Sequence, residues 1–354
     1  MNIRKISYHG EEIVLQEYVP DLYLIHTRAN KALDELRKGV LTWVIPEIQH
    51  KMKVSIWIYD NLSKVNAFCR CVDNHNYIVL STGLLFEFWR EVEDFVDHEK
   101  YSLVFKLSEG GKPHFKDVLF FSMLNFIIAH EYGHIVHGHL KDGRCGYCID
   151  EALEVRAEGN NQTKNWITQL KEYDADSFAV MMQSALLLQE WSEDTNINAA
   201  NVDVIFIANY LCFRTFAEKT GRSFVRYMEK EYADVDHPHP GIRMYYSVLL
   251  FSYWIGRVRG NTEDVINTLS SGTHAIVAYE KNVLEATDIK SCYFSIAFTE
   301  KGCQHVMNLH NGWQELIEYY NQFAYLPIPA MDDIDSLPVS VNENGTFFKR
   351  EENE

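Results

Sequence analysis

The sequence predicts an α+β protein that is predominantly helical, with a small β-sheet packed beside its longest helix. Two long stretches support the helices, at residues 118–140 and 163–191, where apolar side chains recur at helical spacing. Between residues 53 and 81, three shorter stretches alternate apolar and polar residues or are rich in β-branched and aromatic residues, which is typical of strands. The helices therefore supply most of the core, and the strands form a sheet beside them.

The shorter elements follow from periodicity and turn residues. A polar turn at 73–76 joins two of the predicted strands, which indicates a hairpin. A polar stretch containing glycine, 98–115, is expected to be a loop that partly covers a cleft, and 149–157 is expected to be an acidic helix. The strands are predicted at 53–60, 65–72 and 77–81, and further helices at 30–38, 84–95, 201–220 and 245–257.

Length and charge limit the possible functions. The 354 residues could form one large domain or two ordinary ones, and 47% hydrophobic residues are enough for a sizeable core. A formal net charge of −17 argues against binding to nucleic acid or to an anionic membrane. The N-terminus resembles no signal peptide, and the longest apolar runs, about 12 residues each, are too short to span a bilayer. We therefore expect a soluble, cytoplasmic protein without an integral membrane segment.

Three segments are expected along the chain. Residues 1–50 are an N-terminal segment of unknown role, 51–325 a single catalytic domain, and 326–354 an acidic tail that we expect to be disordered. Seven cysteines in a chain without an export signal are expected to be reduced thiols. Cys145 and Cys148 have the spacing of a metal clip, but they have no obvious partner pair, so the sequence leaves open whether they bind a metal.

Two histidines and a glutamate lie together near the end of the first long helix. His130 and His134 are four residues apart and share one helical face, with Glu131 beside them. This is the HExxH arrangement, in which two imidazoles bind zinc and a carboxylate acts on a water molecule. Gly133 keeps the same turn small, so another element can approach closely. The motif also arises by chance, in which case the histidines only cap or pack.

A second pair of acidic residues lies on the second long helix. Glu172 and Asp176 share a face of an otherwise apolar helix, and two carboxylates there are costly to bury unless they meet cations. We expect Glu172 to be the third zinc ligand and Asp176 to accept a hydrogen bond from a ligand histidine. Ala175 and Ala179 border the pair and permit close packing against Gly133. The alternative is an acidic pair on the surface.

His137 and His139 compete with Glu172 for the third ligand position. The HExxHxxGxxH pattern would need glycine at 137 and histidine at 140, whereas this chain has His137 and Leu140. On a continuous helix, His137 lies roughly 10 Å along the axis from His130, too far for zinc–nitrogen bonds of about 2 Å. We therefore predict that Glu172→Ala loses zinc and activity, whereas His137→Ala and His139→Ala keep both.

Five short motifs occur in order along the chain: Asn66-Ala67-Phe68, Ser81-Thr82-Gly83-Leu84-Leu85, His130–His134, Glu172…Ala175-Asp176 and His237-Pro238…Arg243. Together they resemble the gluzincin metallopeptidases of the group that includes the CAAX prenyl endopeptidases and the bacterial heat-shock membrane protease. This chain lacks the transmembrane helices of that group. A weaker resemblance is to soluble phage-exclusion peptidases.

The resemblance implies a zincin-like core with one Zn²⁺ bound by His130, His134 and Glu172, and Glu131 as the general base. It also implies that a histidine of the His-Pro turn steadies the oxyanion, with Arg243 in support. His237 fits the spacing to Arg243 better than His239 does, although both precede a proline; for this turn alone, surface histidines are the default. The implied function is zinc-dependent endopeptidase activity.

Strand 65–72, with Asn66, Ala67 and Phe68, could pair with an extended peptide or protein substrate. Two other functions remain open. One is a regulatory or phage-defence protease of narrow specificity, and the other is a non-catalytic binding protein stabilised by zinc. The sequence leaves the substrate and the oligomeric state undetermined.

Overall fold

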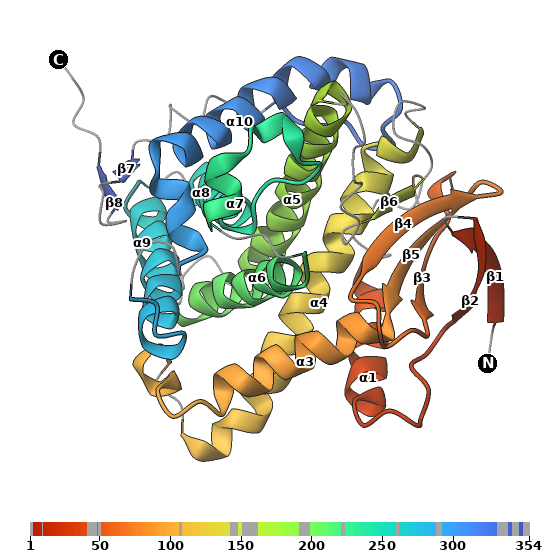
Figure 1. The fold of residues 1–354 in the computed structure, drawn as a ribbon, viewed down its shortest axis with the longest axis horizontal. Helices are drawn as coiled ribbons and strands as arrows, with labels where there is room; N and C mark the ends of the chain where they lie inside the picture. Colours follow the sequence, from red (N-terminus) through yellow and green to blue (C-terminus); the bar gives the residue numbers. More distant parts are fainter. Residues whose placement is uncertain are drawn as a thin grey trace.

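A mixed six-stranded sheet lies at one side of the molecule, and helices form most of the rest (Figure 1). The sheet order is β1-β2-β3-β5-β4-β6, in which β3 and β5 are parallel and the other neighbours are antiparallel. The strands are β1 (Ile3–Tyr8), β2 (Glu11–Gln16), β3 (Val54–Tyr59), β4 (Ala67–Val72), β5 (His75–Ser81) and β6 (Cys148–Asp150). This computed structural model describes residues 3–8, 10–40, 48, 51–105, 108–141, 148–150, 162–190, 199–220, 224–259, 262–287, 292–330, 339–341 and 347–349.

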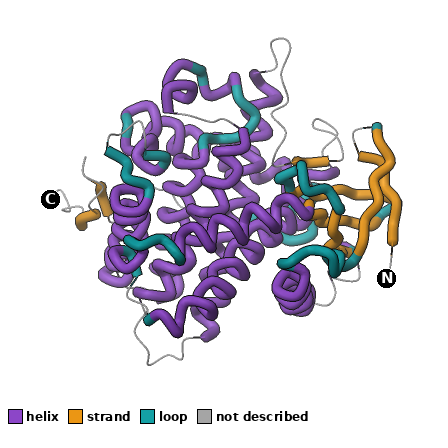
Figure 2. The backbone as a smooth tube through the Cα atoms, turned by 60° about the horizontal axis from the view of Figure 1, so that its bottom comes forward, coloured by secondary structure: helices purple, strands orange, loops and turns teal. Residues whose placement is uncertain are grey.

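Helices are the main element of the described chain, so the predicted α+β, mainly helical class is confirmed (Figure 2). Among the described residues, no helix is both long and apolar enough to cross a bilayer. The α-helices are α1 (His26–Val40), α3 (Thr82–Val96), α4 (Lys112–Val136), α5 (Gln162–Glu190), α6 (Ala199–Thr220), α7 (Phe224–Glu229), α8 (Pro240–Arg259), α9 (Thr262–Ala278) and α10 (Glu300–Asn321). Short 3₁₀ or π turns lie at Tyr101–Leu103, Glu109–Gly111, His139–Lys141, Tyr232–Asp234, Tyr279–Val283 and Phe294–Phe298.

The predicted hairpin joins β4 to β5. Val72 pairs with His75, which leaves Asp73 and Asn74 as a two-residue turn. Both turn residues have positive φ, 50° and 60°, and a type I′ turn needs positive φ at both central residues. Asparagine and aspartate tolerate this region better than most residues, so the polar turn signal in the sequence had a direct physical basis.

The two faces of the sheet are buried in different ways. Ile56, Ile58 and Ile78 belong to the main core, which the sheet shares with the helices. Phe68 and Val79 point to the opposite face of the sheet, since Val79 directly follows Ile78 in the strand. They belong to a small separate cluster, together with side chains of β1 and β2. Alternation along each strand therefore assigns one face to the helical body, and α4 packs against β4 and β5 there, as predicted.

Helix α4 begins earlier and ends earlier than the sequence indicated. It starts at Lys112, so the last part of the stretch expected as a loop is helical; Pro113 sits in the first turn, where its missing N–H costs nothing. The helix ends at Val136, and Gly138 then takes a φ of +76°. This left-handed residue turns the chain away from the helical path, so His139 does not continue the α4 spiral.

The crossing of α4 and α5 depends on Gly133. A Cβ atom at this position would lie 3.1 Å from Phe178 Cβ and 3.2 Å from Ala175 Cα, closer than side chains normally allow. The two long helices therefore approach backbone to backbone at the HExxH turn. The close approach expected between Gly133 and Ala175 is present, and it brings the acidic face of α5 to the histidines of α4.

The two ends of the chain are more structured than expected where the structure describes them. Strands β1 and β2 extend the sheet of β3–β5, so the N-terminal segment is part of the same sheet. At the other end, Ile328 is buried in the main core, and β7 (Val339–Val341) pairs with β8 (Phe347–Lys349). These parts of the tail, expected to be disordered, have defined positions.

The region after α4 differs from the predicted acidic helix. Ile149 and Asp150 lie in strand β6, which pairs with β4, while 151–157 lie outside the described residues. Cys145 also lies outside them, and nothing in the structure describes the side chain of Cys148. The strand places this segment against the sheet, an interaction that local periodicity could not indicate.

Candidate metal centre

Three side chains from two helices meet at the crossing of α4 and α5. His130 and His134 come from α4 and Glu172 from α5, and all three are fully buried. One ligand atom from each lies within 4.8 Å of the others. Within the part of the chain that the structure describes, this is the one group of acidic, histidine or cysteine side chains arranged to hold a metal ion.

The separations within the triad match a zinc site. The Nε2 atoms of His130 and His134 are 3.1 Å apart, and they lie 3.3 and 3.4 Å from the two carboxylate oxygens of Glu172. Tetrahedral bonds of 2.0–2.1 Å would separate neighbouring ligand atoms by about 3.3–3.4 Å. Two nitrogens and one carboxylate oxygen are also the donor set of known catalytic zinc sites. The residues present therefore fit a zinc ion.

Glu172 is held in its charged form. Burial alone would raise its pKa, but the nearby histidines, His237 first and then His130 and His134, outweigh burial and keep the pKa of Glu172 well below its usual range. Neither carboxylate oxygen has the geometry of a hydrogen bond to a described residue. A fully buried carboxylate that faces nitrogens without well-formed hydrogen bonds is suited to a cation.

Asp176 connects the triad to helix α8. His130 Nδ1 lies 2.8 Å from Asp176 Oδ1, and because a carboxylate only accepts, His130 donates from Nδ1 and directs its Nε2 lone pair to the triad. Arg243 donates from Nε and Nη2 to the two oxygens of Asp176, at 2.8 Å each. Arg243 Nη2 also lies 3.5 Å from Glu172. The alternative of a surface acidic pair is wrong, because Glu172 and Asp176 are fully buried.

Tyr246 is a further member of this network that the sequence analysis missed. Its hydroxyl donates to Asp176 Oδ2, and burial together with that carboxylate raises the pKa of Tyr246 well above its ordinary value. Tyr246 lies three residues after Arg243 on α8, so both side chains leave the same helical face. That spacing is the signal that could have found it.

The two histidines of the His-Pro turn lie in different surroundings. His237 is buried, with Nε2 at 3.6 Å from Glu172 Oε1 and Nδ1 at 3.1 Å from Asp236. His239 accepts a hydrogen bond from the backbone N–H of Gly241, and its ring packs near Tyr227. Of the two, His237 is the one that the structure places beside the triad.

The remaining predicted site residues divide into two groups. Glu131 is fully buried next to His130 on α4. The other group belongs to the sheet: Asn66 donates to the hydroxyl of Tyr8, and Phe68 stacks on the same ring at 4.3 Å between centroids. Asn66, Ala67 and Phe68 are all buried. They therefore present no side chain on an open surface.

The edge of β4 is already paired. Phe68 and Arg70 are opposite Asp150 and Cys148 of β6, in antiparallel register. A peptide that pairs with β4 at these positions would need the backbone N–H and C=O groups that β6 already uses. Such pairing therefore requires β6 to dissociate from β4. Substrate pairing with this strand stays a prediction.

The surroundings of the triad come from three parts of the chain that are distant in sequence. Helix α4 supplies two histidines, α5 the carboxylates, the turn before α8 His237, and α8 itself Arg243 and Tyr246.

A scan against protein-family models, a search of curated proteins and a search of solved structures each found no match for this chain. The gluzincin resemblance therefore rests on the motifs and on the buried triad that they predicted.

Proposed function

We propose that this protein is a zinc-dependent peptidase of the gluzincin type. The observation that carries the proposal is the buried triad of His130, His134 and Glu172, with Asp176 and Arg243 behind it. Three protein ligands leave a coordination position for a water molecule, which is typical of catalytic zinc sites, whereas structural sites have four protein ligands. The donor set therefore favours catalysis over a purely structural metal.

The chain's own residues supply the acid–base chemistry. When bound, zinc would act as a Lewis acid and lower the pKa of a coordinated water to about 7. Glu131, beside the ligand His130, takes a proton from the attacking water and passes it to the departing amine of the peptide. Its buried position keeps bulk water from competing for that proton.

His237 stabilises the charge that develops on the substrate carbonyl. Asp236 lies 3.1 Å from His237 Nδ1 in a close but poorly aligned contact, and Nε2 is 3.6 Å from Glu172 Oε1 on the side of the triad. With Nε2 protonated, the ring is a donor beside the proposed reacting centre. The hydrogen bond from His237 to an oxyanion formed there is stronger than its hydrogen bond to the carbonyl oxygen of the ground state.

The full burial of the triad among the described residues supports a narrow range of substrates over general proteolysis. His130, His134, Glu172 and Glu131 are fully buried, and β6 covers part of the β4 edge. A general protease needs an open groove for unstructured chains. We therefore propose a regulatory or defence role, in which one protein or peptide substrate is cleaved when the site opens.

Two substitutions test the proposed function together. Glu131→Gln removes the base but no ligand, so hydrolysis is expected to vanish while zinc stays near one per chain. Glu172→Ala removes a ligand, so zinc and activity are both expected to be lost. Zinc is measured by mass spectrometry of the purified protein, and cleavage by proteomics of cells expressing each form. Retained cleavage in zinc-loaded Glu131→Gln excludes this base, and a zinc-free wild type excludes the metal centre.

A further inference from the structure

A second network of polar side chains reaches the triad from behind His134. His134 Nδ1 lies 2.7 Å from His139 Nδ1, and His139 Nε2 lies 3.2 Å from Asp174 Oδ2. His137 Nδ1 lies 2.5 Å from the same oxygen of Asp174. Asp174 is on α5, between Glu172 and Asp176, but it is not part of the Asp176 network. All four side chains are buried.

The positions of the ring protons on the three histidines follow from Asp174, the acceptor at the end of this series of contacts. Asp174 only accepts, so His137 donates to it from Nδ1 and His139 faces it with Nε2–H, in a close but poorly aligned contact. The 2.7 Å contact between the two Nδ1 atoms needs one N–H and one lone pair, and a His134 that binds metal through Nε2 carries its proton on Nδ1, so the lone pair is on His139 Nδ1. His134 must donate to that lone pair from its own Nδ1, which leaves its Nε2 lone pair facing the triad.

We propose that His139 and Asp174 are positioning residues that hold His134 in the tautomer and orientation needed to bind the metal. The inference rests on the proposed zinc centre and deepens it. Each ligand histidine is then oriented by a carboxylate of α5: His130 directly by Asp176, and His134 through His139 by Asp174. Partners of this kind fix the ring and raise the basicity of the ligand nitrogen.

The turn after α4 is built to deliver His139 to this place. Gly138 has a φ of +76°, and a Cβ there would lie 2.6 Å from the backbone of Phe323. Only glycine fits both conditions, and the reversal brings His139 back toward His134. Spacing along a continuous helix predicted no role for His139 in zinc binding. Because the chain reverses at Gly138, we expect His139→Ala to weaken zinc binding.

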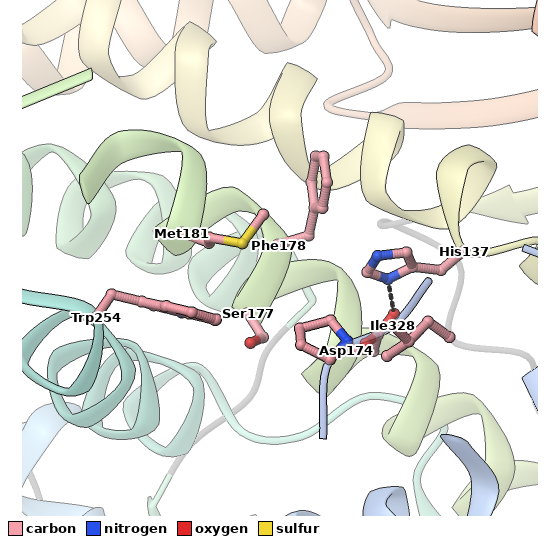
Figure 3. A pocket seen from close by; sticks show the side chains of 8 residues that line it. His137, Asp174, Ser177, Phe178, Met181, Trp254 and Ile328 are labelled. Carbon is pink, nitrogen blue, oxygen red and sulfur yellow. Dashed lines mark hydrogen bonds and ion pairs between the residues drawn. The ribbon is translucent and has the colours of Figure 1, made fainter. Parts of the chain in front are cut away.

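The surroundings of His139 prevent its ring from turning away. Its ring meets Trp313 and Tyr320 of α10 edge to face, with centroids 5.6 and 5.1 Å apart. Lys171 Nζ donates to its carbonyl oxygen at 3.3 Å. Figure 3 shows the far end of the network, where His137 and Asp174 point toward each other beside a small pocket. At about 20 Å³, that pocket has room for little more than one water molecule.

Zinc affinity, measured by competition with a chelator, tests the proposal without requiring turnover. His139→Phe keeps an aromatic ring of similar size but has no acceptor for His134, so zinc affinity is expected to fall roughly 10–100-fold. His139→Gln retains an amide oxygen to accept from His134 and an N–H₂ to face Asp174, so it is expected to recover most of the affinity. Asp174→Asn, which removes the charge at little change in size, is expected to lose about tenfold.

A buried histidine with no printed contact to the triad or to His139 provides the matched control. His305 is as buried as His139 and hydrogen-bonds Tyr227 and Gln169. His305→Phe is expected to lower stability but to leave zinc affinity unchanged. Equal losses of affinity in His305→Phe and His139→Phe would show a general effect of packing and overturn the proposal. If His139→Phe does not fold, Asp174→Asn with wild-type affinity overturns it in the same way.

The tautomer of His134 gives a second readout, from proton and nitrogen NMR of the imidazoles in the zinc-loaded protein. A slowly exchanging Nδ1–H signal assigned to His134 is expected in the wild type and in His139→Gln, and it should be lost or exchange rapidly in His139→Phe. A zinc-free wild type would refute the proposed function itself. Zinc-loaded wild type with the same affinity and the same signal as His139→Phe would refute only the role of His139 and Asp174.

Discussion

At the scale of single residues, Asp176 joins three other side chains in one place. It accepts from His130, Arg243 and Tyr246, and all four groups are buried. Asp176→Ala removes no zinc ligand, but it frees the ring of His130 and leaves the guanidinium of Arg243 without this carboxylate. We expect zinc affinity to fall by roughly 10–100-fold. Chelator competition measures this, and an unchanged affinity would show that His130 needs no carboxylate behind it.

The two histidines of the His-Pro turn give a second test at this scale. Only His237 lies near the triad, at 3.6 Å from Glu172, whereas His239 caps the turn at Gly241. His237→Phe is expected to lower kcat by about 100-fold or more with zinc still bound, which corresponds to the loss of one oxyanion donor. His239→Phe is expected to lower kcat less and to affect folding instead. Steady-state kinetics with metal analysis compares the two, and the opposite order would assign the role to His239.

At the scale of elements, the metal centre depends on how closely α4 and α5 cross. Gly133→Val would place methyl groups against Phe178 and Ala175, where even a Cβ is within 3.1–3.2 Å. The helices must separate, which is expected to cost about 1–3 kcal/mol of stability. Since one helix carries the histidines and the other Glu172, zinc affinity should fall about tenfold or more.

A second tight glycine separates these two effects. Gly272 of α9 packs against the ring of Phe206 of α6, with a virtual Cβ at 1.7 Å, and neither helix carries a residue of the metal centre. Gly272→Val should therefore lower stability in thermal unfolding and leave zinc affinity intact. If both variants bind zinc as the wild type does, the triad tolerates separation of the helices.

The elements also show what a sequence can predict. The long helices, the hairpin and the histidine pair were predictable because periodicity, turn residues and spacing along one helix are local properties. Glu172 was predictable because carboxylates on an otherwise apolar helix face need cations. Strand β6 and the return of His139 were not, because the first depends on pairing with β4 and the second on Phe323, nearly two hundred residues along the chain. The early start of α4 had a local signal in Pro113, which the polar composition of the stretch concealed.

At the scale of the whole molecule, a buried histidine makes stability depend on pH. His305 of α10 is fully buried and hydrogen-bonds Gln169 of α5 and Tyr227 of α7. Burial, with a smaller effect of Lys301, lowers the pKa of His305 to about 3, while an unfolded chain titrates near the ordinary value of 6.5. Between these values the unfolded chain binds more protons, so stability falls as pH decreases, by about 1.4 kcal/mol per pH unit.

Replacing this histidine removes its contribution. From pH 7 to pH 5, the free energy of unfolding of the wild type is expected to fall more than that of His305→Gln, by about 2 kcal/mol. Urea unfolding at the two pH values measures the difference, with a chelator present so that loss of zinc does not contribute. Parallel pH profiles for the two proteins would show that folding does not shift the pKa of His305.

The pairing of β6 with β4 has a consequence for how tightly any partner can bind. A chain that adds at Phe68 and Arg70 competes with the protein's own strand for the same backbone groups. Its observed Kd then equals the intrinsic Kd divided by the fraction of molecules in which that edge is open. If the edge is open in one molecule in a hundred, affinity drops about a hundredfold, or about 2.7 kcal/mol. A strand of three residues is short enough for such an opening to be frequent on the timescale of binding, so the affinity of an edge-binding ligand reports how often β6 is released.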